Sequence, residues 1–159
     1  MIAMRHFLIP PLVAAALLVA GCEEIVTGAH VQSIEVAENA DGGYGPVTLA
    51  LTPDMAPVAI NFRAEHGIDV TEVDKWNSYR ATLTRNGTPV ASGQFHVNYS
   101  GTADSPQGAP YLIMNMLTVY PRDAGDYALT VTPTKPVEIR LSNTQVEVRR
   151  NVQNSRPSR

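Results

Sequence analysis

The stretch YRATLTRNGTPVASGQF, residues 79–95, has the pattern of a β-hairpin. Tyr79, Ala81 and Leu83 alternate with polar residues before Asn86-Gly87, and a second strand-like run follows. A two-residue type I′ turn needs positive φ at both central positions, which Asn-Gly tolerates well. Because successive strand side chains point to opposite faces, we expect one face of this hairpin to enter a core.

The same alternation recurs along most of the chain. It predicts strands at residues 31–37, 47–52, 58–64, 76–85, 88–99, 111–120, 126–133 and 137–149, the last with a break near Ser142-Asn143. The other sets expected to face the core are Val47, Leu49 and Leu51; Val58, Ile60 and Phe62; Phe95, Val97 and Tyr99; and Tyr127, Leu129 and Val131. Eight short strands without a long 3.6-residue apolar period predict an all-β, two-sheet antiparallel sandwich.

Residues 111–120, YLIMNMLTVY, do not alternate. Ile113, Leu117 and Val119 would face one side, and Leu112, Met114, Met116 and Tyr120 the other. A strand that is apolar on both faces is either covered twice or exposes an adaptable Met-rich patch. We favour burial; the alternative is a partner-binding patch beside the loop at residues 99–110, made of Tyr111, Met114, Met116 and Tyr120.

A second segment points to a particular kind of sandwich. Asp123-Ala124-Gly125-Asp126-Tyr127-Ala128-Leu129 resembles the Asp-x-Gly-x-Tyr-x-Cys segment of immunoglobulin-like domains. The resemblance implies a structural corner at Asp123, Gly125 and Tyr127, in which the tyrosine hydroxyl bonds back to the backbone. It also implies an immunoglobulin-like fold whose disulfide is replaced, because Leu129 stands at one cysteine position.

Two further residues bear on this resemblance. Phe62 lies where it could fill the site of the other cysteine, and Trp76 has a plausible separation from Tyr127 for the core tryptophan of such domains. However, Trp76 has the opposite parity to Tyr79 and its alternating neighbours. The immunoglobulin topology therefore stays open.

The amino end has the build of a secretory signal. Arg5 precedes an apolar segment at residues 7–19, and the small residues Ala20 and Gly21 lead to Cys22. As a helix, the apolar segment would span roughly 20 Å, less than the ~30 Å hydrocarbon core of a bilayer. We therefore expect a signal peptide at residues 1–21 and no permanent membrane span there.

Val19-Ala20-Gly21-Cys22 resembles the lipobox of bacterial lipoproteins. The resemblance implies cleavage before Cys22, lipidation of Cys22 with diacylglycerol and a further acyl chain such as palmitate, and anchoring in the cell envelope. Glu23 is not the aspartate linked with inner-membrane retention in enteric bacteria, which favours the outer membrane, facing the periplasm. The alternative is an ordinary secretory signal with an incidental Cys22.

Composition bounds the rest of the chain. Residues 22–30 are expected to form a tether, 31–149 one domain and 150–159 a disordered basic tail, with binding of that tail to anionic lipid as the alternative. No cysteine follows Cys22, so the domain has no disulfide. Without Arg5, the 12 Lys and Arg residues become 11 against 15 Asp and Glu, and this acidic balance argues against nucleic acid as a partner.

No catalytic motif emerges from the remaining residues. His30, His66 and His96 lack the spacing of a metal site, and Asp69, Glu72 and Asp74 are more typical of a solvated loop than of a calcium site. We expect no catalytic residue, cofactor or metal. The favoured function is a non-catalytic envelope lipoprotein that binds an envelope protein or cell-wall component at the membrane surface. The alternatives are a periplasmic immunity or inhibitor lipoprotein that neutralises a toxin or lytic enzyme, and a metal-dependent hydrolase using His66.

Overall fold

The structure, a computed structural model, describes residues 27–65, 74–98, 102–104 and 110–153. These residues form β1 (Ala29–Glu35), β2 (Tyr44–Leu51), the 3₁₀ helix η1 (Pro53–Met55), β3 (Val58–Glu65), β4 (Trp76–Arg85), β5 (Thr88–Asn98), β6 (Thr102–Asp104), β7 (Pro110–Val119), β8 (Gly125–Pro133) and β9 (Ser142–Arg150). The all-β class is confirmed. Among the described residues, no helix has the length and apolar character needed to cross a membrane.

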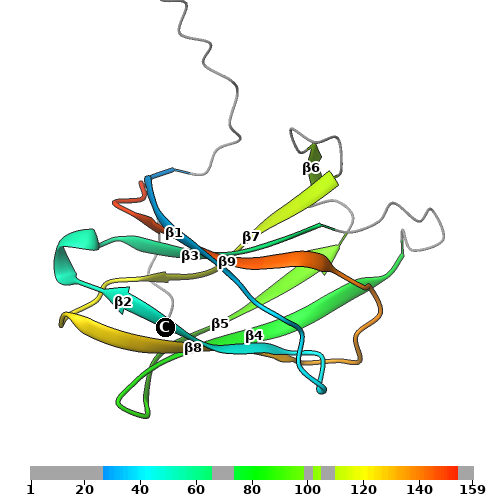
Figure 1. Cartoon of the computed structure of the whole chain (residues 1–159), viewed down its shortest axis with the longest axis horizontal. Coiled ribbons are helices and arrows are strands. Elements are labelled where there is room, and N and C mark those ends of the chain that lie inside the picture. Colours follow the sequence, from blue (N-terminus) through cyan, green and yellow to red (C-terminus); the bar gives the residue numbers. More distant parts are fainter. Residues whose placement is uncertain (1–26, 66–73, 99–101, 105–109, 154–159) are drawn as a thin grey trace, which may run out of the picture.

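The strands form two antiparallel sheets packed face to face (Figure 1). One sheet has the order β1-β9-β3-β7-β6 and the other the order β2-β8-β4-β5. The predicted two-sheet sandwich is therefore confirmed. Two strand assignments differ: β6 was not expected, and residues 137–141 form a connection, so the last strand begins at Ser142, where the sequence suggested a break.

The strand order of immunoglobulin domains is present in the six strands β3 to β8, and it differs at β2 and β9. The runs β3-β7-β6 and β8-β4-β5 match strands B-E-D and F-C-C′ of immunoglobulin domains. Beside β8, however, β2 takes the position of the last immunoglobulin strand, while β9 takes the position of the first strand beside β3. Strands β2 and β9 have thus exchanged sheets relative to the immunoglobulin topology, and β1 adds a further strand beside β9.

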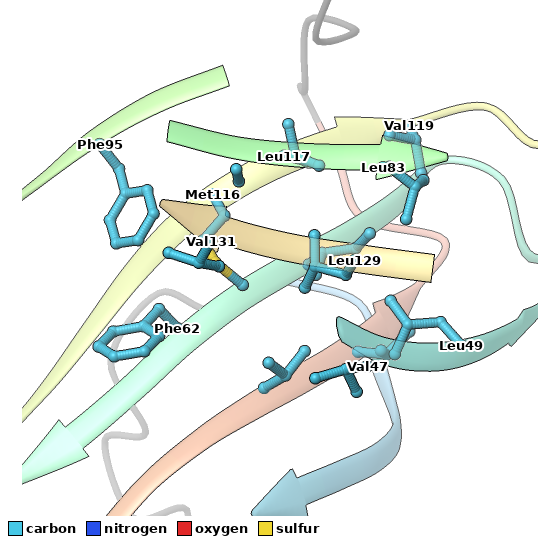
Figure 2. Close-up of a cluster of buried hydrophobic side chains, with 14 of the residues drawn as sticks. Val47, Leu49, Phe62, Leu83, Phe95, Met116, Leu117, Val119, Leu129 and Val131 are labelled. Atoms are coloured by element: carbon cyan, nitrogen blue, oxygen red, sulfur yellow. The ribbon is translucent and has the colours of Figure 1, made fainter. Parts of the chain in front are cut away.

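The core lies between the sheets and is built from the alternating sets (Figure 2). All of the predicted core residues in these sets that the structure describes are buried, whereas Tyr99 lies outside the described residues. Four aromatic rings, those of Tyr44, Phe62, Tyr79 and Phe95, meet at centroid separations of 5.0–6.2 Å. Such tilted ring pairs add to the stabilisation that apolar burial provides.

Trp76 does not fill the core, although its separation from Tyr127 is plausible for the core tryptophan of immunoglobulin-like domains. Its side chain is 40% exposed, while Tyr79, three residues later on β4, is fully buried. The parity conflict seen in the sequence is the physical reason, because Tyr79 and its alternating neighbours occupy the inward positions of β4. Phe62 and Leu129, the two residues that the resemblance places at the cysteine positions, are both buried in the core.

A β-bulge explains the unusual pattern of β7. Ile60 pairs with Leu117 and Asn61 with Asn115, which leaves Met116 as an extra residue. The bulge changes the facing of every residue beyond it. Leu112 therefore shares the core with Leu117 and Val119, whereas Ile113 lies opposite Arg63. The predicted grouping of Ile113 with Leu117 and Val119 is wrong, because strict alternation does not hold across the bulge at Met116.

Turns and chain ends complete the fold. Asn86 and Gly87 both have positive φ, 50° and 78°, as the hairpin prediction required. At the carboxyl end, Val152 is buried, and its amide donates a hydrogen bond to the Pro57 carbonyl. Residues 150–153 thus belong to the domain, which corrects the predicted start of the basic tail; residues 154–159 lie outside the described residues.

Candidate functional site

The tyrosine corner at the start of β8 has the predicted geometry. The Tyr127 hydroxyl donates a 2.8 Å hydrogen bond to the Asp123 carbonyl oxygen, and the Tyr127 side chain is almost fully buried. Gly125 has a φ of 146°, a conformation that residues with a Cβ rarely adopt. These contacts confirm the structural corner that the immunoglobulin-like segment implied.

Arg85, the last residue of β4, binds this corner from the strand next to β8. Its guanidinium forms an ion pair with the Asp123 carboxylate and donates a 3.1 Å hydrogen bond to the Ala124 carbonyl. The same group lies 5.6 Å from the centroid of the Tyr127 ring. The β4–β5 hairpin is thereby held against the turn between β7 and β8.

A cleft of about 580 Å³ lies between this hairpin and that turn. Its apolar lining comes from buried side chains of both sheets, namely Leu51, Leu83, Ala91, Val119 and Tyr127. On its rim, Val90 is 51% exposed and Tyr120 47% exposed, beside Arg85, Arg122 and Asp123. The volume falls within the range of sites that bind small molecules or partner side chains.

The charges on the rim are not all neutralised. Arg85 already pairs with Asp123, whereas no described acidic residue forms an ion pair with Arg122, which is exposed. An apolar group can enter the cleft while an anionic group next to it meets the Arg122 guanidinium. The cleft thus combines an apolar interior with a cationic edge.

The structure separates the four residues predicted to form a partner-binding patch. Met116 is buried, and Met114 is partly buried and packs against the core. Tyr111 is half-buried, with the Arg63 guanidinium 5.3 Å from its ring centroid. Only Tyr120 reaches the cleft. The Met-rich strand is therefore mainly a core element, which was the favoured interpretation.

Sequence reasoning missed Val90, Arg122 and Arg85 as members of the cleft. Val90 is the extra residue of a bulge in β5, because Leu83 pairs with Ala91 and Thr84 with Pro89. An apolar residue directly after Pro89 in a strand with polar outward positions was the available signal. Arg122 and Arg85 gave no such signal, because they are 37 positions apart in the sequence and meet the cleft only through the fold.

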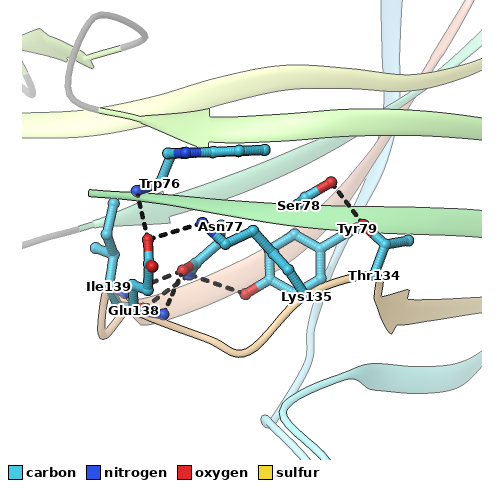
Figure 3. A network of polar contacts seen from close by, with 8 residues as sticks. All are labelled: Trp76, Asn77, Ser78, Tyr79, Thr134, Lys135, Glu138 and Ile139. Carbon is cyan, nitrogen blue, oxygen red and sulfur yellow. Dashed lines mark hydrogen bonds and ion pairs between the residues drawn. The ribbon is translucent and has the colours of Figure 1, made fainter. Parts of the chain in front are cut away.

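A polar network occupies the opposite end of β4 (Figure 3). Glu138 accepts a 2.8 Å hydrogen bond from Lys135 Nζ and a 3.3 Å bond from the Trp76 amide. The Lys135 contact is the main reason that the pKa of Glu138 lies below its ordinary value. Lys135 Nζ also lies 3.9 Å from the Trp76 ring centroid, and the exposed His96 ring meets that ring edge-on at 5.0 Å.

The remaining residues singled out in the sequence are the predicted lipidation site and the candidate metal ligands. Cys22, His66, Asp69 and Glu72 lie outside the described residues. Within the described part of the chain, no three His, Cys, Asp or Glu side chains gather in a way that could hold a metal ion. Comparisons with protein-family models, curated proteins and solved structures find no match to this chain.

Proposed function

We propose that the protein is a non-catalytic envelope lipoprotein, anchored at Cys22, whose sandwich domain binds a partner at the cleft beside the tyrosine corner. The observation that carries the proposal is the cleft itself, in which an apolar interior is combined with exposed Val90 and Tyr120 and with Arg122 outside any described ion pair. Exposed apolar residues around a concave site are typical of binding surfaces.

The position of the chain ends supports an interaction at the membrane surface. The Gln153 amide donates to Thr27 Oγ1, and the Asn151 amide donates to the Met55 carbonyl in η1. Because η1 follows β2, whose last residue Leu51 lines the cleft, the described chain begins at the end of the sandwich where the cleft lies. Five residue steps from Cys22 to Thr27 reach at most ~18 Å. A Cys22 anchor would therefore keep the cleft close to the bilayer.

The anchor is tested by replacing Cys22 with Ser in the full chain. We expect the parent chain to sediment with membranes and the variant to be released into the soluble envelope fraction. A second measurement is mass spectrometry of the mature amino terminus, which should begin at an acylated Cys22. Retention of Cys22→Ser in the membrane fraction would contradict the anchoring mechanism.

The cleft is tested by partner capture from envelope extracts with the full chain. We expect saturable capture that Tyr120→Ser and Arg122→Ser each weaken at least tenfold, because these residues line the rim of the cleft. Arg140→Ser is the matched control, since Arg140 is also exposed but lies outside the residues that line the cleft. Equal capture by the parent, the Tyr120 and Arg122 variants and the control would reject the cleft as the binding site.

A further inference from the structure

The outer edge of β5 ends at the cleft. β5 is the last strand in the order β2-β8-β4-β5, and among the described residues no strand pairs with its outer edge. From Ala91 to Asn98 the inner edge of β5 pairs with β4 without interruption, so the outer edge is regular over the same length. Ala91, where the regular pairing stops, and Val90, the extra residue of the bulge, both line the cleft. The open strand edge and the cleft therefore form one continuous surface.

This edge has none of the features that prevent a further strand from pairing. An open edge presents N–H and C=O groups to an added strand, and natural sheets block such edges with charges, prolines, bulges or short strands. Residues 91–98, ASGQFHVN, contain no Lys, Arg, Asp, Glu or Pro and pair regularly. The opposite edge of the same sheet is a poorer template, because β2 pairs regularly with β8 only from Val47 to Leu51, after a bulge that contains Pro46.

The two sheets approach each other closely just beyond the cleft. An added Cβ at Gly93 of β5 would lie 2.7 Å from the Met116 carbonyl oxygen and 3.0 Å from the Leu117 side chain, both in β7. A chain that occupies the cleft therefore cannot continue between β5 and β7 at this point. The outer edge of β5 is open to it as an extended strand.

The bulge and the charge of the rim define the direction of such a strand. Pairing along the edge stops at Ala91, because Val90 is bulged and Pro89 has no N–H group. An added strand thus ends beside the cleft. The Asp123 carboxylate on the rim already binds Arg85, whereas Arg122 attracts a terminal carboxylate and repels a terminal ammonium. The carboxyl end of the strand therefore lies at the cleft, and the strand runs antiparallel to β5, as β4 does on the other edge.

We infer that the cleft and the β5 edge together bind the carboxyl-terminal strand of a partner protein, an extended peptide with an apolar last side chain and a free terminal carboxylate. The inference rests on the proposed function, since it uses the same cleft, and it names the chemistry of the partner. The last side chain enters the cleft beside Val90 and Tyr120, and the carboxylate meets Arg122. The preceding residues pair with residues 91–98. Main-chain hydrogen bonds supply affinity in such complexes, and the pocket supplies specificity.

The peptide class is tested with the full chain and a library of seven-residue peptides displayed with free carboxyl termini. We expect selection to enrich peptides whose last residue is apolar. A second library carries the same randomised residues followed by Gly-Ser-Gly, which moves the carboxylate away from the apolar residue, and should give no such enrichment. Equal enrichment from both libraries, or no enrichment from either, would overturn the inference.

The carboxylate contact is tested by the affinity of a selected peptide, measured by fluorescence anisotropy. Amidation of its carboxyl terminus should weaken binding about tenfold or more, because a charge-assisted hydrogen bond is lost. With Arg122→Ser the acid and the amide should bind equally. Arg140→Ser is the matched control and should keep the difference, since Arg140 is exposed but does not line the cleft. A difference that survives in Arg122→Ser would overturn the inference.

The strand pairing is tested by N-methylation of the peptide, which leaves the protein unaltered. In an antiparallel ladder every second amide of the added strand faces β5, and the amides between them face solvent. We expect methyl groups on alternate amides to weaken binding about tenfold, and those on the amides between them to have little effect. Loss of affinity without this alternation, or no loss, would overturn the inference. Capture from envelope extracts that depends on Tyr120 would still support the cleft, so the proposed function fails or stands separately.

Discussion

Asn77 and Ile139 are joined by two hydrogen bonds, one in each direction, across 62 residues of sequence. Asn77 Nδ2 donates to the Ile139 carbonyl at 2.8 Å, and the Ile139 amide donates to Asn77 Oδ1 at 2.9 Å. The side-chain amide thus takes the place of a neighbouring strand and satisfies a buried backbone pair. Oδ1 also accepts from the Glu138 amide, and Nδ2 donates to the Tyr79 hydroxyl (Figure 3).

This geometry predicts a large effect of Asn77→Ala. The change leaves the amide and carbonyl of Ile139 without their partners in a buried place, and unpaired buried groups cost about 1–3 kcal/mol each. We expect a loss of about 3 kcal/mol in the free energy of unfolding, measured by urea denaturation. Thr130→Ala, at an exposed position on β8, is the control and should change that value by about 0.5 kcal/mol or less. A small effect of Asn77→Ala would show that the connection between β8 and β9 keeps its conformation without the hydrogen bonds of the Asn77 side chain.

The lowered pKa of Glu138 predicts that the stability of the folded protein depends on pH. Its pKa is lowered in the folded protein, mainly by the hydrogen bond from Lys135. A carboxyl with a depressed folded pKa adds stability above its unfolded pKa, and that stability is lost as pH falls through the folded pKa. Thermal unfolding should therefore show Glu138→Gln to be less stable than the parent at neutral pH, with the difference vanishing in acid.

Lys135→Gln provides the matched background for this prediction. Without the ammonium, the largest cause of the lowered Glu138 pKa is removed, so Glu138→Gln should then have a smaller effect on stability at neutral pH. An undiminished effect in that background would assign the stabilisation to the Trp76 amide instead.

The hydrogen bond in the tyrosine corner predicts that removing the Tyr127 hydroxyl lowers the stability of the fold modestly. Tyr127→Phe removes the hydrogen bond to the Asp123 carbonyl and should lower the free energy of unfolding by about 1 kcal/mol in urea. Tyr111→Phe is a suitable control, because the contact that Tyr111 makes with Arg63 is through its ring and survives the loss of the hydroxyl. Equal stability of the two variants would mean that ring packing alone holds the corner.

Alternation was sufficient to predict most of the buried faces. Leu49, Leu83 and Leu129 sit at inward positions of strands whose pattern has period two, and all three are buried. The corner was equally predictable, because Gly125 and Tyr127 depend on local backbone geometry. These features need only neighbouring residues, which is why the sequence alone indicates them.

The errors arose where tertiary pairing changes the local pattern. The bulge at Met116 depends on how β7 meets β3, so parity misplaced Ile113. The exchange of β2 and β9 depends on which sheet each strand joins, which no local pattern specifies. The cleft is similar, because Val90 and Arg122 come together only when the hairpin packs against the corner.

The central claim is that the cleft holds a partner while the protein is anchored in the envelope. It is tested most directly by placing a photo-reactive amino acid at Tyr120 in the full chain and irradiating intact cells, with position 130 as the control site. We predict a discrete adduct from position 120, identified by mass spectrometry as a molecule other than this chain and lost with Arg122→Ser. No adduct at position 120, or the same adducts from both positions, would contradict the claim.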